Sequence, residues 1–286
     1  MILAGLCFVG VTALVKLLGP RLPAAESAFL RYLIGLIFLI PAIKPILAAK
    51  VTKRQLKLFT LRGVAHTGAV TLWFFAMARI PLADVTAMNY LSPVYVTLGA
   101  ALFLGERFAA RRVLAIAAAL IGALIILRPG FREIGTGHIA MIFTAMGFGV
   151  SYLVGKKVSD EVSPAVVVAM LSVTVSIGLA PLAIPVWVTP TFGELVILAG
   201  VAVLATLGHY VMSLGFRAAP VSVTQPATFL QLVWAVSLGA LAFGEPVDPY
   251  VILGGAFIVG AISFISWREA VLKRRQITPE PNATRY

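Results

Sequence analysis

Two apolar stretches of the chain carry polar side chains at a regular spacing of three residues. In the first stretch these are Thr86, Asn89 and Ser92. A step of three keeps side chains within about a third of the circumference of an α-helix. Polar groups are costly in lipid, so such faces should turn inward, either to line a hydrated site or to hold helices together by hydrogen bonds. At an offset of 139 residues, the second stretch repeats the pattern with Gln225, Thr228 and Gln231.

Arg31 is the charge that lies deepest in an apolar stretch, about 10 Å along the expected helix 24–43. Glu26 is five positions away and would face another direction. We expect Glu26 to pair with Lys16 across the short connection between the first two apolar stretches. Arg31 then needs a backbone carbonyl, a distant partner or an anionic group on a ligand, so a structural tie and a ligand contact both stay open.

Aromatic side chains at middle depth offer walls for a planar ligand. Stacking on such rings favours planar or aromatic solutes, whereas ordinary packing is the alternative for any single residue. The rings that we assign to the walls of the site are Trp73, Tyr90, His209 and Trp234.

Enzymatic motifs are not found. His66, His138 and His209 lie far apart in the sequence and outside any HExxH pattern, and Cys7 is the single cysteine. Carboxylates do not cluster at metal-ligand spacing. Gly155 and Lys156 lack the preceding glycine and the following Ser or Thr of a phosphate loop. The sequence therefore predicts no catalytic residues, no metal site and no cofactor.

The elements that position these residues must lie in a membrane. Hydrophobic residues make up 60% of the chain and charged residues 12%, against about 25% in soluble domains. The net charge of +12 does not indicate nucleic acid, because the basic residues lie in short gaps between apolar runs. Open sheet edges are not tolerated in lipid, so the spans are helices. We expect ten, at 2–18, 24–43, 63–80, 83–104, 113–127, 138–155, 162–184, 195–215, 221–243 and 249–267.

The distribution of Lys and Arg orients these spans. With both termini inside, cytoplasmic segments hold seventeen basic residues, Arg62 among them, and outer loops hold four. We therefore expect a multi-pass protein of the inner or plasma membrane with cytoplasmic termini. A cleaved signal peptide is disfavoured because the first span has no basic leader and carries Lys16. The polar tail 268–286 is expected to be disordered.

The chain contains an internal repeat of two halves. At the same offset of 139, Pro81 aligns with Pro220, and the Gly105-Glu106 pair aligns with Gly244-Glu245. Five spans per half is an odd number, so the second half must insert upside down. The loop after Glu106 is basic and the loop after Glu245 is acidic, which fits opposite sides of the membrane. Inverted repeats are typical of alternating-access transporters, whereas duplication kept only for folding economy is the alternative.

The run from Pro81 to Phe108, ending Leu-Phe-Leu-Gly-Glu-Arg-Phe, resembles the fourth span of EamA-type proteins of the drug/metabolite transporter superfamily. Leu-Ala-Phe-Gly-Glu-Pro in the second half and Arg128-Pro129-Gly130 after the fifth span are also similar to that family. The resemblance extends to Trp267 and departs from the family pattern in lacking a short polar leader. It implies ten spans, two EamA repeats and a central cavity.

The sequence thus predicts an all-α polytopic membrane protein of ten transmembrane helices in two inverted five-helix repeats, 1–130 and 138–267. The expected function is secondary transport of a small organic metabolite. The rival hypotheses are a non-transporting accessory subunit and a membrane-embedded lipid-modifying enzyme. Ala118-x-x-x-Gly122 and Ala256-x-x-x-Gly260 permit close helix contact, within the bundle or in a homodimer.

Overall fold

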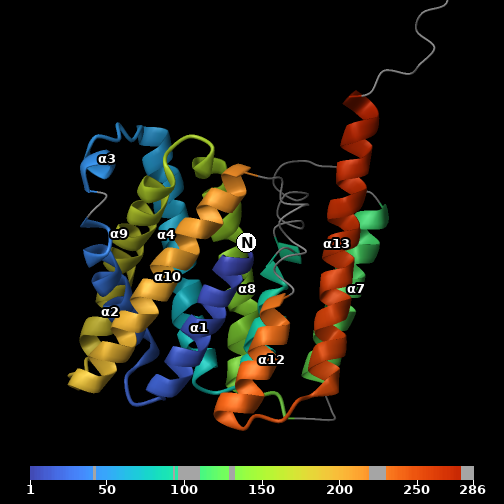
Figure 1. Ribbon diagram of the computed structural model, residues 1–286, viewed down its shortest axis with the longest axis horizontal. Coiled ribbons are helices and arrows are strands. Elements are labelled where there is room, and N and C mark those ends of the chain that lie inside the picture. The colour runs from blue at the N-terminus through green and yellow to red at the C-terminus, as the bar shows by residue number, and fades with distance from the viewer. Residues whose placement is uncertain (41–42, 93, 96–109, 129–132, 219–229, 278–286) are drawn as a thin grey trace, which may run out of the picture.

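The computed structural model describes residues 1–40, 43–92, 94–95, 110–128, 133–218 and 230–277. Every regular element in these ranges is helical, as the sequence predicts, and the helices stand side by side in one bundle (Figure 1). The described helices are α1 (Ile2–Leu18), α2 (Ala24–Ile37), α3 (Ile43–Leu47), α4 (Lys53–Met77), α5 (Leu82–Asn89), α7 (Ala110–Leu127), α8 (Thr136–Ser159), α9 (Pro164–Ala183) with the short turn η2 (Ile184–Val186), α10 (Phe192–Ala218), α12 (Leu230–Phe243) and α13 (Pro249–Ile277).

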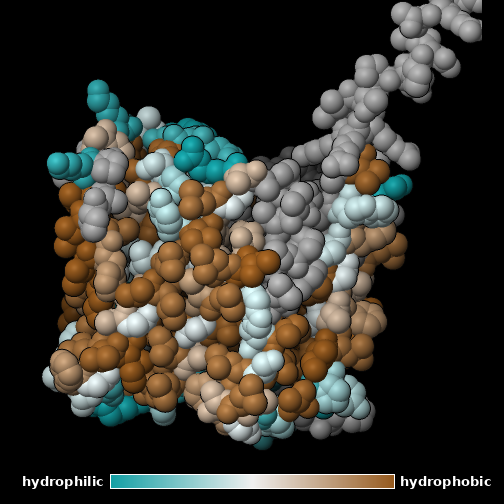
Figure 2. All heavy atoms as spheres, viewed as in Figure 1, coloured by the Kyte–Doolittle hydropathy of each residue, from teal (hydrophilic) through white to brown (hydrophobic). Residues whose placement is uncertain are grey.

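The surface has the character of a protein that sits in lipid. Figure 2 shows a broad hydrophobic belt around the middle of the bundle, with hydrophilic side chains gathered toward its two ends. Within the described ranges, three helical segments are long and apolar enough to cross a membrane by themselves: Thr136–Ser159, Pro164–Val186 and Phe192–Gly215. Together with the shorter apolar helices, they form a polytopic membrane bundle.

Helix α4 begins earlier than predicted. We expected this span at 63–80, but the helix starts at Lys53 because Thr52 and Gln55 form a capping box. In that box the Thr52 hydroxyl accepts from the Gln55 backbone, and the Gln55 side chain accepts from the Thr52 backbone. Arg62 therefore lies inside a helix and is only 2% exposed, so its assignment to a cytoplasmic loop was wrong.

Two other boundaries differ from the prediction. Helix α2 ends at Ile37, ahead of Pro41 in the sequence, and the short α3 follows, so the expected single span 24–43 was too long. Helix α13 continues to Ile277, so residues 268–277 are helical and not part of a disordered tail. This segment lacks Gly and Pro and is rich in good helix formers such as Arg, Leu and Lys.

Polar contacts between helices gather at two ends of the bundle, which we name the Lys16 end and the Glu161 end. At the Lys16 end, four carboxylates each bind an element far away in the sequence: Glu245 pairs with Lys16, Glu194 with Arg21, Asp248 with Arg128, and Asp84 with His138. At the Glu161 end, Glu161 pairs with Arg54 at the start of α4. Figure 1 places the Lys16 end at the bottom, where α1 and α12 finish and α13 begins.

The expected Lys16–Glu26 pair does not form. Lys16 pairs with Glu245, which follows α12, and also donates to the Ile80 carbonyl at 3.3 Å. Glu26 instead accepts a hydrogen bond from the Val188 backbone at 2.9 Å. Helix α1 packs mainly on α10 and α12 and makes little contact with its sequence neighbour α2, so the short connection does not bring Lys16 and Glu26 together.

Helices α7 and α13 pack at backbone distance. A methyl group added to Gly122 would lie 2.6 Å from the Gly254 carbonyl oxygen, so only glycine fits there. The predicted role of Gly122 in close helix contact is thus met inside the bundle. Gly260, the second predicted small residue of α13, has nothing within 4 Å of such a methyl group.

Candidate functional site

Two arginines lie in the interior of the bundle. Arg31 on α2 is 4% exposed, and Arg62 on α4 is 2% exposed. The guanidinium carbon of Arg31 lies 3.7 Å from the centre of the Tyr32 ring. Arg62 donates through Nη1 to the Val167 carbonyl of α9 at 3.3 Å. Its guanidinium group also packs on Gly155 of α8, where an added methyl group would approach it to 3.1 Å.

Two histidines meet beside these arginines. His66 follows Arg62 by one turn of α4, and its Nδ1 lies 2.8 Å from the Ser151 hydroxyl of α8. The centre of the His66 ring is 5.5 Å from that of His209 on α10 and 6.0 Å from that of Tyr32. The fold therefore joins two histidines that the sequence separates widely. The described residues hold no group of three or more His, Cys, Asp or Glu side chains suited to a metal ion.

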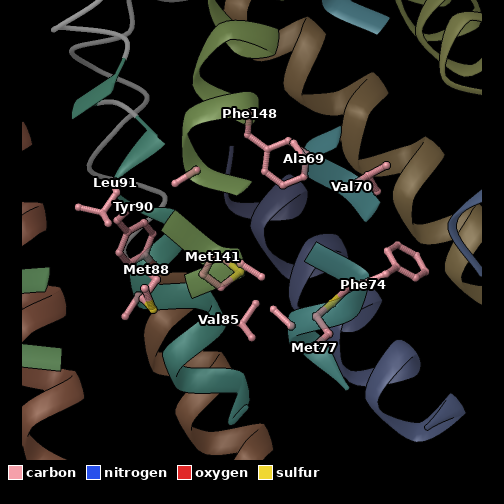
Figure 3. Packing of buried hydrophobic residues seen from close by; sticks show 14 of the residues in the cluster. Ala69, Val70, Phe74, Met77, Val85, Met88, Tyr90, Leu91, Met141 and Phe148 are labelled. Carbon is pink, nitrogen blue, oxygen red and sulfur yellow. The ribbon is translucent and has the colours of Figure 1, made fainter. Parts of the chain in front are cut away.

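Aromatic rings form a wall next to the histidines. Phe148 and Tyr152 of α8 stack with their ring centres 5.7 Å apart and their planes inclined by 20°. The Trp73 ring meets Phe148 edge-on at 5.6 Å, and Phe8 of α1 meets His209 edge-on at 5.1 Å. Figure 3 shows Phe148 at the upper edge of the apolar cluster that fills the space between α4, α5 and α8. The wall is thus continuous with the rigid core.

Several polar atoms of this buried group have no hydrogen-bond partner within the described part of the chain. They are the Tyr32 hydroxyl, Nε of Arg62 and Nδ1 of His209. Buried polar groups are normally paired, so three such atoms in one place indicate a site that a bound molecule or water completes. We name the set of Arg31, Tyr32, Arg62, His66 and His209 the arginine–histidine cluster.

Five of the predicted site residues lie at this cluster or against its wall. Arg31 and His209 belong to it, and Trp73 contacts it through Phe148. Asn89, at the end of α5, interacts with the Tyr152 hydroxyl. Ser92 follows, 1% exposed, with its hydroxyl 3.4 Å from the Asn89 side-chain oxygen.

The other predicted residues lie elsewhere. Thr86 is buried within α5 at 8% exposure, and the Tyr90 hydroxyl interacts with the Leu232 backbone of α12. Gln231 packs on Gly5 of α1, where an added methyl group would come within 2.8 Å of its Cγ. Trp234 packs in a separate apolar cluster that includes Leu82, toward the Lys16 end. Gln225 and Thr228 lie outside the described residues.

The sequence analysis did not identify Tyr32, Arg62, His66 or Ser151 as members of the site. Two signals were present in the sequence. The Thr52–Gln55 capping box extends α4 far enough to bring Arg62 into the bundle. Arg62 and His66 are then spaced by four, which places them on one helix face.

The chain matches the EamA-like transporter family twice, over residues 1–128 and 135–267. The chain belongs to the EamA-like transporter family. This EamA protein is 31% identical to a riboflavin transporter of Rhizobium johnstonii, over 96% of this chain and 92% of the relative. It is 28% identical to the pseudopaline exporter CntI of Pseudomonas aeruginosa, over 93% of this chain and 94% of that protein. The prediction of a small-molecule transporter, as opposed to an enzyme, is confirmed.

A crystal structure also shares the fold of this EamA protein, with a TM-score of 0.61 at 18% sequence identity. The alignment covers 96% of this chain and 99% of that one. At this identity the likeness shows the fold alone.

Proposed function

We propose that this EamA protein carries a small organic solute across the inner or plasma membrane by alternating access between two inverted five-helix halves. The first half comprises α1 to α7 and the second comprises α8 to α13. Both termini face the cytoplasm, and the arginine–histidine cluster lies at the solute site between the halves. The orientation of the helix ends is the observation that carries the proposal.

Contacts at the Lys16 end support inversion. The C-terminal part of α1 meets the residue that follows α12, through Lys16 and Glu245. The C-terminal end of α7 meets the start of α13, through Arg128 and Asp248. Arg21, just after α1, meets the first turn of α10 at Glu194. Each contact joins a helix end of the first half to an end of the second half.

The Glu161 end supplies the complementary orientation. Arg54, at the start of α4, pairs with Glu161, which follows α8. Helix α4 therefore begins at the Glu161 end, whereas its repeat counterpart α10 begins at the Lys16 end. Helix α1 likewise finishes at the Lys16 end and its counterpart α8 at the Glu161 end. Counterparts that run in opposite directions are what inverted repeats require.

The packing of helices follows the same exchange. Helix α1 packs on α10 while α4 packs on α8, and each of these pairs becomes the other when the two halves are swapped. Helix α2 packs on its counterpart α9, and α7 packs on its counterpart α13, which are pairs that a twofold axis maps onto themselves. This pattern supports a pseudo-twofold axis with the solute site near its centre.

The chemistry of the site favours a planar aromatic solute. The stacked rings of Phe148 and Tyr152, with Trp73 and His209 beside them, offer flat apolar surfaces. Asn89 and Ser92 add hydrogen-bonding groups, and Gln225, Thr228 and Gln231 are their counterparts at the repeat offset. A flavin fits this description, and a riboflavin transporter is among the relatives.

Reconstitution of the purified chain alone into liposomes tests this function, with labelled riboflavin as the probe. We expect uptake by the wild-type protein. Asn89→Leu should lower the rate at least tenfold while leaving expression intact, because it removes an amide beside Tyr152 that the solute uses. Thr60→Leu, on the exposed surface of α4, is the matched control and should transport normally.

Two results would contradict parts of the proposal. Normal transport by Asn89→Leu would show that the assigned polar face of α5 does not bind the solute. A chain that transports no flavin by itself, but does so with a co-purified membrane protein, would be an accessory subunit.

A further inference from the structure

We infer that the solute carries an oxyanion group, a carboxylate or a phosphate, which binds between Arg31 and Arg62. The inference rests on the proposed function and adds the charge of the solute to it. The Arg31 guanidinium lies 3.7 Å from the Tyr32 ring, and the centre of that ring lies 6.0 Å from that of His66, which follows Arg62 by one turn of α4. The two arginines therefore lie beside the same pair of rings.

The balance of charge in the bundle requires a negative partner. Within the described part of the chain, no carboxylate lies within ion-pair distance of either arginine. Among the described side chains, six carboxylates pair with basic residues: Glu245, Glu194, Asp248, Asp84, Glu161 and Asp160. Glu26 uses one oxygen on the Val188 backbone. Two buried cations that pair with no described carboxylate are costly in a membrane protein, and such charges mark solute pathways.

Hydrogen-bonding capacity points the same way. A guanidinium group has five N–H donors in a fork that matches carboxylate and phosphate oxygens. Arg62 uses Nη1 on the Val167 carbonyl, while its Nε has no partner in the described residues. An oxyanion between the two arginines would accept from the free donors of both guanidinium groups.

A purely structural role accounts for less of the geometry. A tie between α4 and α9 through Arg62 needs one hydrogen bond, and lysine or glutamine could supply it. A neutral flavin leaves both charges uncompensated. His66 follows Arg62 by one turn of α4, and its ring centre lies 4.9 Å from that of Phe148. A solute whose anionic group binds Arg62 would therefore place its aromatic part against the ring wall.

Three flavins that share one ring system isolate the charge. Riboflavin is neutral, riboflavin 5′-phosphate carries a phosphate, and 10-carboxymethylflavin carries a carboxylate. Binding to the purified full-length chain is measured by quenching of flavin fluorescence. We expect at least one anionic flavin to bind about 10- to 100-fold more tightly than riboflavin, the factor that charge-assisted hydrogen bonds supply. The tighter of the two anions identifies the oxyanion.

Arginine variants then test where the preference arises. Arg31→Met and Arg62→Met should each reduce this preference, the ratio of anionic-flavin to riboflavin affinity, to less than about threefold. Arg62→Lys serves as a second variant in case Arg62→Met does not fold. It should still bind the anionic flavin more tightly than riboflavin, but with an affinity ratio about tenfold lower than that of wild type, because lysine lacks the planar fork of arginine. Arg54→Met is the matched control, since it removes an exposed arginine at the Glu161 end and should leave the preference unchanged.

The results separate this inference from the proposed function. If riboflavin and both anions bind equally, or if the preference survives Arg31→Met and Arg62→Met, the inference is wrong even when transport of riboflavin is normal. Failure of all three flavins to bind also overturns it. Loss of transport in liposomes, with anion binding intact, would instead contradict the proposed function alone.

Discussion

The Lys16 end offers the sharpest test of alternating access. The Glu245 carboxylate holds two elements of the first half: it pairs with Lys16 of α1, and it accepts a hydrogen bond from the Leu82 backbone at the start of α5 at 3.0 Å. Glu245 itself belongs to the second half, just after α12. If the halves separate at this end during transport, both contacts must break. Glu245→Ala should therefore favour the state that is open at the Lys16 end.

The magnitude follows from the two contacts. A hydrogen bond to a charged group contributes about 1.5–3 kcal/mol. The ion pair is partly exposed, at 23% for the Lys16 side chain and 11% for Glu245, and such pairs contribute up to about 1 kcal/mol. Their loss together disfavours the closed state by about 2–4 kcal/mol. At about 1.4 kcal/mol per factor of ten, the open fraction should rise about 30- to 1,000-fold.

Ala235 supplies the position for a probe. It lies on α12 in the apolar cluster with Val9 and Leu82, between the halves and toward the Lys16 end, and is 1% exposed. Ala235→Cys is made in a Cys7→Ala background, because Cys7 is the single cysteine of the chain. A membrane-impermeant maleimide is then added from the side that the Lys16 end faces. Its labelling rate reports the open fraction.

The outcome is compared with a control of the same chemistry. Asp160→Ala removes the ion pair with Lys156, which lies within the second half and does not connect the two halves. The labelling rate should therefore not change. Lys16→Met should accelerate labelling less than Glu245→Ala, since the bond from Leu82 remains. Labelling within twofold of the parent in both Glu245→Ala and Lys16→Met would refute the idea that these contacts close the Lys16 end.

Two further predictions concern stability. Gly254→Ala should lower the free energy of unfolding in detergent by about 1–3 kcal/mol, because the new methyl group would come within 2.6 Å of Ile126 Cγ1. Gly260→Ala is the control: nothing lies within 4 Å of its new methyl group, so it should not destabilise the protein. Thermal unfolding measures both, and equal effects would contradict the close packing of α7 on α13. Gln55 and Arg54 hydrogen-bond Glu161 and hold its pKa below the ordinary value of 4.5, so its stabilising effect is full above that value and is lost as the pH falls through the lowered pKa. Wild type should therefore unfold at a higher temperature than Glu161→Gln at neutral pH, and the gap should close in acid; a constant gap would refute the assignment.

The sequence predicted the features that depend on local composition and on the repeat. Apolar runs identified the helices because lipid leaves no other way to satisfy the backbone, and the boundaries of α1 match the prediction. Asn89, which interacts with Tyr152, was proposed from its three-residue spacing and its counterpart at the repeat offset. The apolar run and the three-residue spacing can be recognised in the sequence because each lies within one helix.

Contacts between distant helices could not be read in this way. The start of α4 was missed because Lys53, Arg54 and Lys57 interrupt the apolar pattern, although the capping box marks it. His66 and His209 meet only because α4 and α10 both reach the centre of the bundle. The partner of Lys16 was misassigned to Glu26 for the same reason: closeness in sequence does not make α1 and α2 pack together.

Helix α5 connects the Lys16 end to the arginine–histidine cluster, the proposed solute site. Its first residue, Leu82, donates to Glu245, and its last, Asn89, interacts with Tyr152 beside the arginine–histidine cluster. Seven steps of helix separate them, about 10 Å, which is too short for the two ends to move independently. Between them Asp84 pairs with His138 of α8, which ties the helix to the second half. We therefore expect release of Leu82 from Glu245 to shift Asn89, so that a solute bound at Asn89 would bias the contacts at the Lys16 end.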